Sequence, residues 1–210
     1  MIRWSVINKS KPRTLLLMHG LFTSAGYWLP YLKSLKEYRL LVPDIDYRGI
    51  RDVDAYLGRI NEVIGEQAGG KVDAVIAHSL GCLLASLMPQ EARGASFEIC
   101  PVYCAARREQ DEFVGEIERK IRPALSQDAI RALLAEVDGA IDAHSLRATV
   151  RKGSAIYVPD ADRYFLYQVS PDARWFSGDH FEITEAVTDI GSKLGACDVI
   201  QEFRMRLELE

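Results

Sequence analysis

Short runs of Val, Ile and Leu alternate along this chain with longer stretches in which apolar residues recur every three or four positions. Apolar runs that are separated by helical segments are typical of parallel strands buried on both faces. The sequence therefore predicts an α/β fold, a mostly parallel twisted sheet with helices on both faces. The expected strands span residues 3–7, 14–19, 38–43, 72–77, 96–102, 155–158 and 174–176. The expected helices between them span residues 25–36, 53–67, 80–88 and 181–194.

Residues 104–152 follow a different pattern. Strand-like runs disappear there, and charged helical segments take their place, with breaks near Pro123 and Gly139. The apolar residues of this segment are too few for an independent core. A chain of 210 residues also favours one domain over two. We therefore expect a single domain over residues 1–210, in which residues 104–152 form an inserted helical lid over the edge of the sheet.

Charge and cysteine content exclude several classes of partner. The chain has 30 acidic and 26 basic residues, so it offers no long-range attraction to nucleic acid or anionic lipid. The apolar run of residues 15–18 is too short to span a bilayer, and no signal-peptide pattern precedes it. The four cysteines do not form a pair of metal-binding knuckles. We expect a cytoplasmic protein that binds neither nucleic acid, membrane nor metal.

The most informative segment, residues 72–85, reads as an apolar strand, a tight turn and an apolar helix, with Ser79 on the turn. Such a turn exposes a serine hydroxyl above the sheet and needs small neighbours, which Ala77 and Gly81 provide. Ser79 is therefore a candidate nucleophile. Taken alone, a serine between a strand and a helix can equally be a helix N-cap.

A nucleophile of this kind needs donors for the oxyanion that forms on attack. The first amides of a helix lack partners within the helix, so the amide of Leu80 is one candidate. The strand that ends in His19-Gly20 offers a second, and of Leu21 and Phe22 we favour the amide of Leu21. We expect His19 and His78 to serve packing and hydrogen bonding around this loop and turn.

The chain resembles the α/β-hydrolase superfamily in four pieces that occur in the order of that family. They are His19-Gly20, Asp46-Tyr47-Arg48-Gly49, Ala77-His78-Ser79-Leu80-Gly81 and Gly178-Asp179-His180-Phe181. The resemblance implies that His180 is the base that accepts the serine proton. It also implies an acid just after the strand at 155–158. We favour Asp162, three residues after Pro159, and Asp160 stays an alternative.

These residues predict a serine hydrolase that cleaves a carboxylic ester or thioester in two acyl-transfer steps, which need no cofactor. The expected substrate is a small-molecule or carrier-bound acyl ester, and Phe22 and Phe113 are candidates for contact with its acyl group. The small size and the insertion resemble carboxylesterases such as the methyl esterases that act on pimeloyl-carrier-protein esters. An acyl thioesterase, a carbon–carbon bond hydrolase and a non-catalytic binding module on the same fold stay open.

The insertion also carries a run of charges of mixed sign, which is typical of a solvated helical face. The alternative is a docking surface for an acidic carrier, which requires its basic residues to converge in space. Those residues are Arg107, Arg108, Arg119, Lys120 and Arg122.

Overall fold

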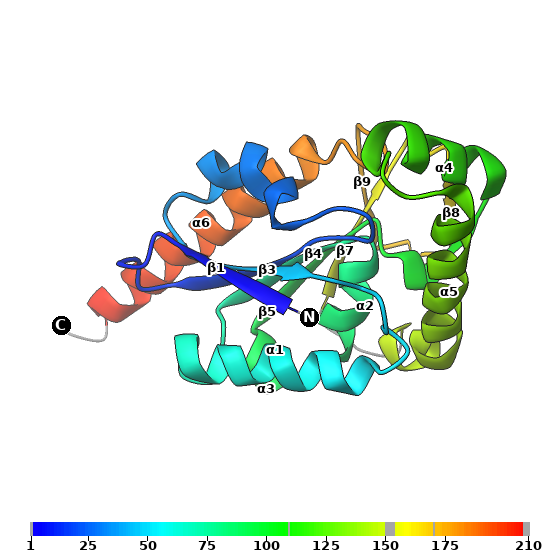
Figure 1. Cartoon of the computed structure of the whole chain (residues 1–210). Coiled ribbons are helices and arrows are strands. Elements are labelled where there is room, and N and C mark those ends of the chain that lie inside the picture. The colour runs from blue at the N-terminus through cyan, green and yellow to red at the C-terminus, as the bar shows by residue number, and fades with distance from the viewer. Residues whose placement is uncertain (1, 109, 150–153, 170, 208–210) are drawn as a thin grey trace.

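The computed structural model describes residues 2–108, 110–149, 154–169 and 171–207, with side chains except at 110, 149 and 197–207. Its centre is a seven-stranded sheet in the order β1-β3-β2-β4-β5-β7-β9 (Figure 1). The strands are β1 (Ile2–Ile7), β2 (Thr14–Met18), β3 (Arg39–Ile45), β4 (Ala74–His78), β5 (Ala95–Ile99), β7 (Ser154–Pro159) and β9 (Arg174–Phe176). Only β1 runs antiparallel to its neighbour within this sheet. The predicted α/β fold and mostly parallel sheet are confirmed.

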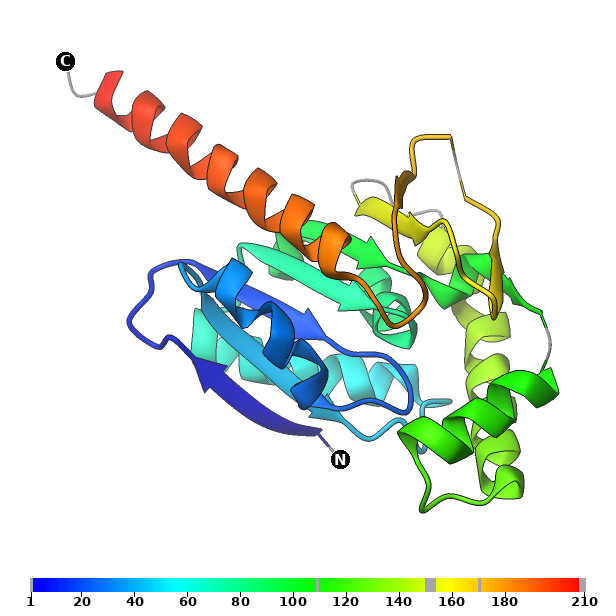
Figure 2. The same ribbon diagram turned by 90° about the horizontal axis from the view of Figure 1, so that it is seen from above.

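Helices cover both faces of the sheet because successive side chains of each strand point to opposite sides. In β2, Leu15 and Leu17 pack on one face, and Leu16 and Met18 pack on the other. The first face holds η1 (Ala25–Leu35) and α6 (Thr184–Leu207), and the far end of α6 projects past the sheet (Figure 2). The second face holds α1 (Val53–Ala68), α2 (Leu80–Leu87) and α3 (Gln90–Arg93).

Two of the expected helices differ in detail from the structure. The segment expected at 25–36 is a 3-10 helix with Pro30 inside it, and proline removes a backbone donor that an α-helix would use. The helix expected from residue 181 begins at Thr184, because Asp179 Oδ1 accepts hydrogen bonds from the amides of Phe181 and Glu182 and holds them in a turn.

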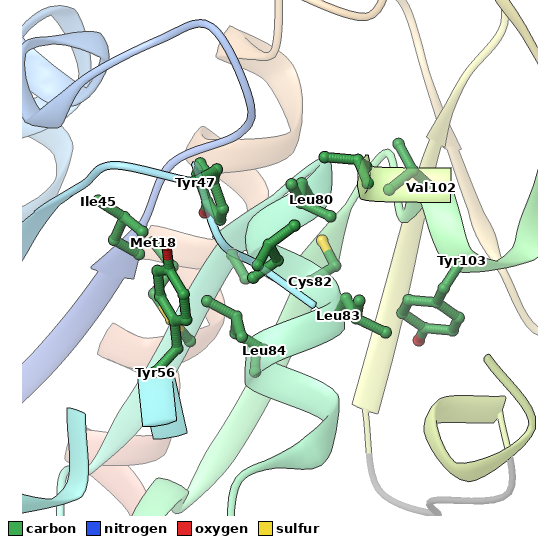
Figure 3. Close-up of a cluster of buried hydrophobic side chains, with 14 of the residues drawn as sticks. Met18, Ile45, Tyr47, Tyr56, Leu80, Cys82, Leu83, Leu84, Val102 and Tyr103 are labelled. Atoms are coloured by element: carbon green, nitrogen blue, oxygen red, sulfur yellow. The ribbon is translucent and has the colours of Figure 1, made fainter. Parts of the chain in front are cut away.

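The short helix α2 is buried along its whole length between the sheet and the helices beyond it. Figure 3 shows Leu80, Leu83 and Leu84 of α2 among buried side chains from several other elements. The labelled neighbours from those elements are Met18, Ile45, Tyr47, Tyr56, Val102 and Tyr103. This packing fixes the N-terminus of α2, where Ser79 lies.

The chain between β5 and β7 forms η2 (Val102–Cys104), β6 (Ala105–Arg107), α4 (Gln110–Glu116), the π-helix η3 (Ile117–Ile121) and α5 (Gln127–Thr149). Figure 1 shows α4 and α5 together at one end of the sheet. Residues 110–121 and 127–149 of this segment are helical, as expected, and residues 109 and 150–153 lie outside the described residues.

Two expectations for this segment are wrong. No break occurs at Gly139, because α5 continues through it and its packing outweighs the low helix propensity of glycine. Strand structure does not disappear either: β6 pairs antiparallel with β8 (Phe165–Tyr167) in a separate two-stranded sheet. In the described part of the chain, no helix combines the length and the apolar character that a membrane span requires.

Candidate active site

Ser79 occupies a strained turn between β4 and α2. Its backbone angles are φ 54° and ψ −120°, a left-handed conformation that residues other than glycine rarely adopt. The side chain makes no capping hydrogen bond to α2, so the N-cap alternative does not describe this serine. Its amide donates to the carbonyl of Ile99 at 2.9 Å, which ties the turn to β5.

Two glycines allow the chain to pack tightly around this turn. A Cβ atom on Gly81 would lie 2.7 Å from the carbonyl oxygen of His19 and 2.8 Å from that of Met18. A Cβ atom on Gly20 would lie 2.7 Å from the Cβ atom of Ser79. Only hydrogen fits at either position, so the small residues at 20 and 81 bring the His19-Gly20 loop against the serine turn.

His180 lies between Ser79 and Asp162 and is within hydrogen-bond distance of both. Its Nε2 atom is 3.0 Å from Ser79 Oγ, and its Nδ1 atom is 3.1 Å from Asp162 Oδ2. A carboxylate only accepts, so the proton of the neutral ring is assigned to Nδ1, and Nε2 is left free to accept the serine proton. All three side chains are almost completely buried.

The structure places Asp162, not Asp160, against His180. Asp162 Oδ1 accepts hydrogen bonds from the amides of Tyr164 and Phe165 at 2.8 and 3.0 Å, which fixes the carboxylate. Asp160 is exposed, and its Oδ1 atom accepts from the amide of Gly178 at 3.2 Å. It therefore closes the neighbouring loop.

His19 and His78 hold the loops around the site, as expected from their positions. His19 Nε2 accepts the amide proton of Ile45 at 2.9 Å, so its Nδ1 carries the ring proton and donates to the Gly20 carbonyl. His78 Nε2 donates to the carbonyl of His180 at 2.7 Å, and its ring stacks on Tyr27. Burial lowers the pKa of both imidazoles, so they stay neutral near pH 7.

A cavity of about 440 Å³ opens beside Ser79 and His180. Leu21 and Leu80, the residues whose amides we expect as oxyanion donors, both border it. The expected acyl contacts Phe22 and Phe113 also line it. Its wall also includes apolar and charged side chains. The apolar ones are Val102, Leu134, Val137, Ile141, Phe165 and Phe181, and the charged ones are Arg107, Arg108, Asp138 and Asp142.

Of the five basic residues considered for a docking surface, four border two adjoining cavities. Arg107 and Arg108 border the first cavity, and Arg107 pairs with Asp138 at 2.6 Å. Lys120 and Arg122 instead border a second, more open cavity of about 620 Å³, together with Arg163. The two cavities meet at Phe22 and Phe181, which line both.

Two residues of β8 contact the site without having been identified from the sequence. The ring of Phe165 stacks on that of His180 with centroids 4.6 Å apart, and the hydroxyl of Tyr167 reaches Asp162 and His180. The alternation of aromatic residues at 165 and 167 is the only signal, and three residues are too few for it to predict a strand.

The described residues contain no group of three or more His, Cys, Asp or Glu side chains that could hold a metal ion. The thiols of Cys82 and Cys100 are buried, and burial raises the pKa of both well above the usual value. They are therefore packing residues at neutral pH.

Comparison with known structures finds the same fold in several hydrolases. The N-acyl homoserine lactonase AidH is 14% identical, with 93% of this chain and 91% of that chain covered and a TM-score of 0.59. A carboxylesterase structure from Nitrososphaera gargenis is 14% identical, with coverage of 95% and 94% and a TM-score of 0.57. The thioesterase domain from the curacin biosynthetic pathway is 14% identical, with coverage of 91% and 94% and a TM-score of 0.55. Identities this low show a shared fold alone.

Comparison with curated protein sequences finds no match. The sequence pattern of the Alpha/beta hydrolase family, however, matches residues 15–198, which include the serine turn, both acidic candidates and His180. This match spans most of the chain. The chain therefore belongs to the alpha/beta hydrolase family.

Proposed function

We propose that this protein is a serine hydrolase that cleaves a carboxylic ester or thioester through an acyl-enzyme on Ser79. The observation that carries the proposal is the unbroken contact from Ser79 Oγ through His180 to Asp162, at 3.0 and 3.1 Å. A serine hydroxyl is a weak nucleophile at neutral pH, and a base with an orienting acid overcomes this weakness.

In the first step, Ser79 Oγ attacks the substrate carbonyl carbon while His180 Nε2 takes the hydroxyl proton. The amides of Leu21 and Leu80 donate to the oxyanion of the tetrahedral intermediate. The intermediate collapses, the bond to the alcohol or thiol breaks, and His180 returns its proton to that leaving group. Asp162 stabilises the imidazolium throughout this step.

In the second step, water replaces the leaving group. His180 takes a proton from the water as its oxygen attacks the acyl carbon, and the same amides hold the second oxyanion. Collapse of this intermediate releases the carboxylic acid and returns the proton to Ser79. The sequence of steps uses only side chains, amides and water.

The acyl group is assigned to the cavity of about 440 Å³, with Phe22 and Phe113 in contact with it. This volume is in the range of small-molecule sites, roughly 300–1,000 Å³. Helices α4 and α5 supply Phe113, Leu134 and Val137 to its wall. We therefore assign residues 104–152 the role of a lid that shapes the acyl site and excludes water.

A fluorophosphonate probe tests the proposal, because it phosphonylates activated serines. The expected result is one label per chain on Ser79 and none on the Ser79→Ala or His180→Ala variants. Folded wild-type protein that takes no label would support the non-catalytic binding module. Label on the Ser79→Ala variant would contradict the assignment of the nucleophile.

A series of p-nitrophenyl esters of increasing acyl length then measures the acyl site. The apolar side chains in the wall predict that kcat/KM rises from the acetyl ester to esters of intermediate length. The strongest activity on the acetyl ester would contradict the assignment of the whole cavity to the acyl group, and it would count against a carrier-bound substrate.

The second cavity favours a thioesterase as the alternative function. Three cationic side chains, Lys120, Arg122 and Arg163, line it beside Glu116 and Asp179, and it adjoins the first cavity. A phosphate-bearing leaving group is complementary to the excess of positive charge. The test compares acyl thioesters of a phosphorylated and an unphosphorylated pantetheine thiol. A KM that is lower for the phosphorylated thiol, and a difference that added salt removes, would support this alternative.

A further inference from the structure

The strand β8 presents two aromatic side chains to His180. Phe165 and Tyr167 are two residues apart, so they share one face of the strand, while Leu166 between them is 51% exposed. Phe165 lies over the ring of His180 at a 30° angle between planes. The hydroxyl of Tyr167 lies 2.6 Å from Asp162 Oδ2 and 3.1 Å from His180 Nδ1.

A tyrosine hydroxyl has one proton to donate and lone pairs to accept. The hydroxyl of Tyr167 donates a hydrogen bond to Asp162 Oδ2, and the Nδ1 proton of His180 faces both the carboxylate and the tyrosine oxygen. Because Oδ1 already accepts two backbone amides, this bond completes a set of four contacts around Asp162. Burial raises the pKa of Tyr167 well above its usual value, which keeps the hydroxyl a donor.

The rest of the structure fixes Tyr167 in turn. Its backbone pairs with Ala105 of β6. The strand β6 ends at Arg107, which lines the acyl cavity. One short strand pair thus joins the wall of the cavity to the side chains that orient the imidazole.

We propose that Tyr167 is a positioning residue of this hydrolase, which holds Asp162 and His180 so that Nε2 faces Ser79. The proposal rests on the proposed function, since it concerns the orientation of the base. An imidazole bonded to a single carboxylate oxygen can tilt about that one contact. The hydroxyl of Tyr167 gives Nδ1 of His180 a second contact, and the stacked ring of Phe165 restricts the tilt of the imidazole plane.

The Tyr167→Phe variant tests this inference, with Tyr157→Phe as a matched control. Tyr157 is also buried, and its hydroxyl donates to a carboxylate, that of Asp189 in α6, at 2.8 Å. We expect Tyr167→Phe to lower kcat by about 10- to 100-fold with KM unchanged within about threefold, because a misplaced base slows the chemical step. Tyr157→Phe should keep both constants within about twofold of wild type.

A double-mutant cycle separates positioning from general structural loss. If Tyr167 acts through Asp162, its substitution in an Asp162→Asn background should lower kcat by less than about twofold. Two results would overturn the inference. One is a fall in kcat of about 10- to 100-fold on substitution of Tyr167 in both the wild-type and the Asp162→Asn protein, and the other is an unchanged kcat in the Tyr167→Phe single variant.

Expressing kcat per Ser79 titrated by the fluorophosphonate removes the effect of any unfolded fraction in either variant. If the wild-type protein is active and labelled, and Tyr167→Phe has the same kcat per titrated Ser79, only the role of Tyr167 is refuted. Wild-type protein that is folded, unlabelled and inactive would refute the proposed function and this inference together.

Discussion

Gly20 lies so close to Ser79 that a single methyl group there should disturb the nucleophile. In Gly20→Ala the new Cβ atom would meet Ser79 Cβ at 2.7 Å, so the serine turn or the loop must shift. We expect a cost of about 1–3 kcal/mol in stability and a rate of fluorophosphonate labelling lower by about 100-fold.

Gly58 provides the matched control for that change. It is an exposed residue of α1 with open space at its Cβ position. Gly58→Ala should leave the labelling rate unchanged and stabilise the helix by about 0.5–1 kcal/mol. If Gly20→Ala and Gly58→Ala are labelled at the same rate, the close approach of residue 20 to Ser79 is not needed for the reactivity of the serine.

The two acids after β7 should differ sharply when each is changed to the amide. Asp162→Asn removes the charge that fixes the tautomer of His180, and we expect kcat to fall by about 10³- to 10⁴-fold. Asp160→Asn keeps the oxygen that accepts from Gly178, and kcat should stay within about twofold of wild type. Steady-state kinetics on one p-nitrophenyl ester measure both; a larger loss in Asp160→Asn would reverse the assignment.

The sequence suffices to identify Ser79, His180 and the two acidic candidates, because each follows a recognisable strand. It does not suffice to choose between Asp160 and Asp162. That choice depends on the turn after β7, in which the amides of Tyr164 and Phe165 bind one carboxylate. Tyr167 is also beyond sequence reasoning, since its contact with Asp162 depends on the pairing of β8 with the distant β6.

At the scale of elements, long periodic segments are predictable and short ones are not. The stripe of buried residues in α1 gives its bounds to within one residue. Gly139 misleads because a glycine is a common helix end, yet the packing of α5 outweighs its low helix propensity. The strands β6 and β8 have three residues each, and only their mutual pairing stabilises them as strands.

The continuity of α5 makes Gly139 a site for stabilisation. A Cβ atom there would lie 3.9 Å from Arg51 Nε, an ordinary contact distance. Gly139→Ala should therefore stabilise the protein by about 0.5–1 kcal/mol and raise Tm by roughly 2 °C. The contrasting variant is Gly69→Ala, where φ is 65° and alanine should cost about 1 kcal/mol. Thermal melting that shows a loss of stability in Gly139→Ala would argue for a break in α5.

At the scale of the whole molecule, one buried acid should make stability depend on pH. Glu98 of β5 is fully buried, and burial raises its pKa above the usual value. The protonated form is thus favoured more in the folded than in the unfolded chain. The contribution of protonated Glu98 to the free energy of unfolding is complete below a pH of about 4.3, the pKa of glutamate in the unfolded chain. It is lost as the pH rises through the higher pKa of Glu98 in the folded chain.

Glu98→Gln should remove this dependence, because glutamine keeps an oxygen that can accept from the hydroxyl of Tyr103 and does not ionise. We expect the variant to be more stable than wild type at pH 8, with a difference that disappears near pH 4. Urea unfolding at both pH values measures it, with exposed Glu66→Gln as the control. Equal stability of Glu98→Gln and wild type at pH 8 would contradict the prediction.

The three side chains of the site come from positions 79, 162 and 180 of a chain of 210 residues. Ser79 is therefore synthesised 101 residues before His180, its proposed base. A nascent or prematurely terminated chain that stops before residue 180 holds the serine without the imidazole that would make it reactive. Under the proposed mechanism, hydrolysis therefore requires that β4, β5, β7 and β9 have all assembled.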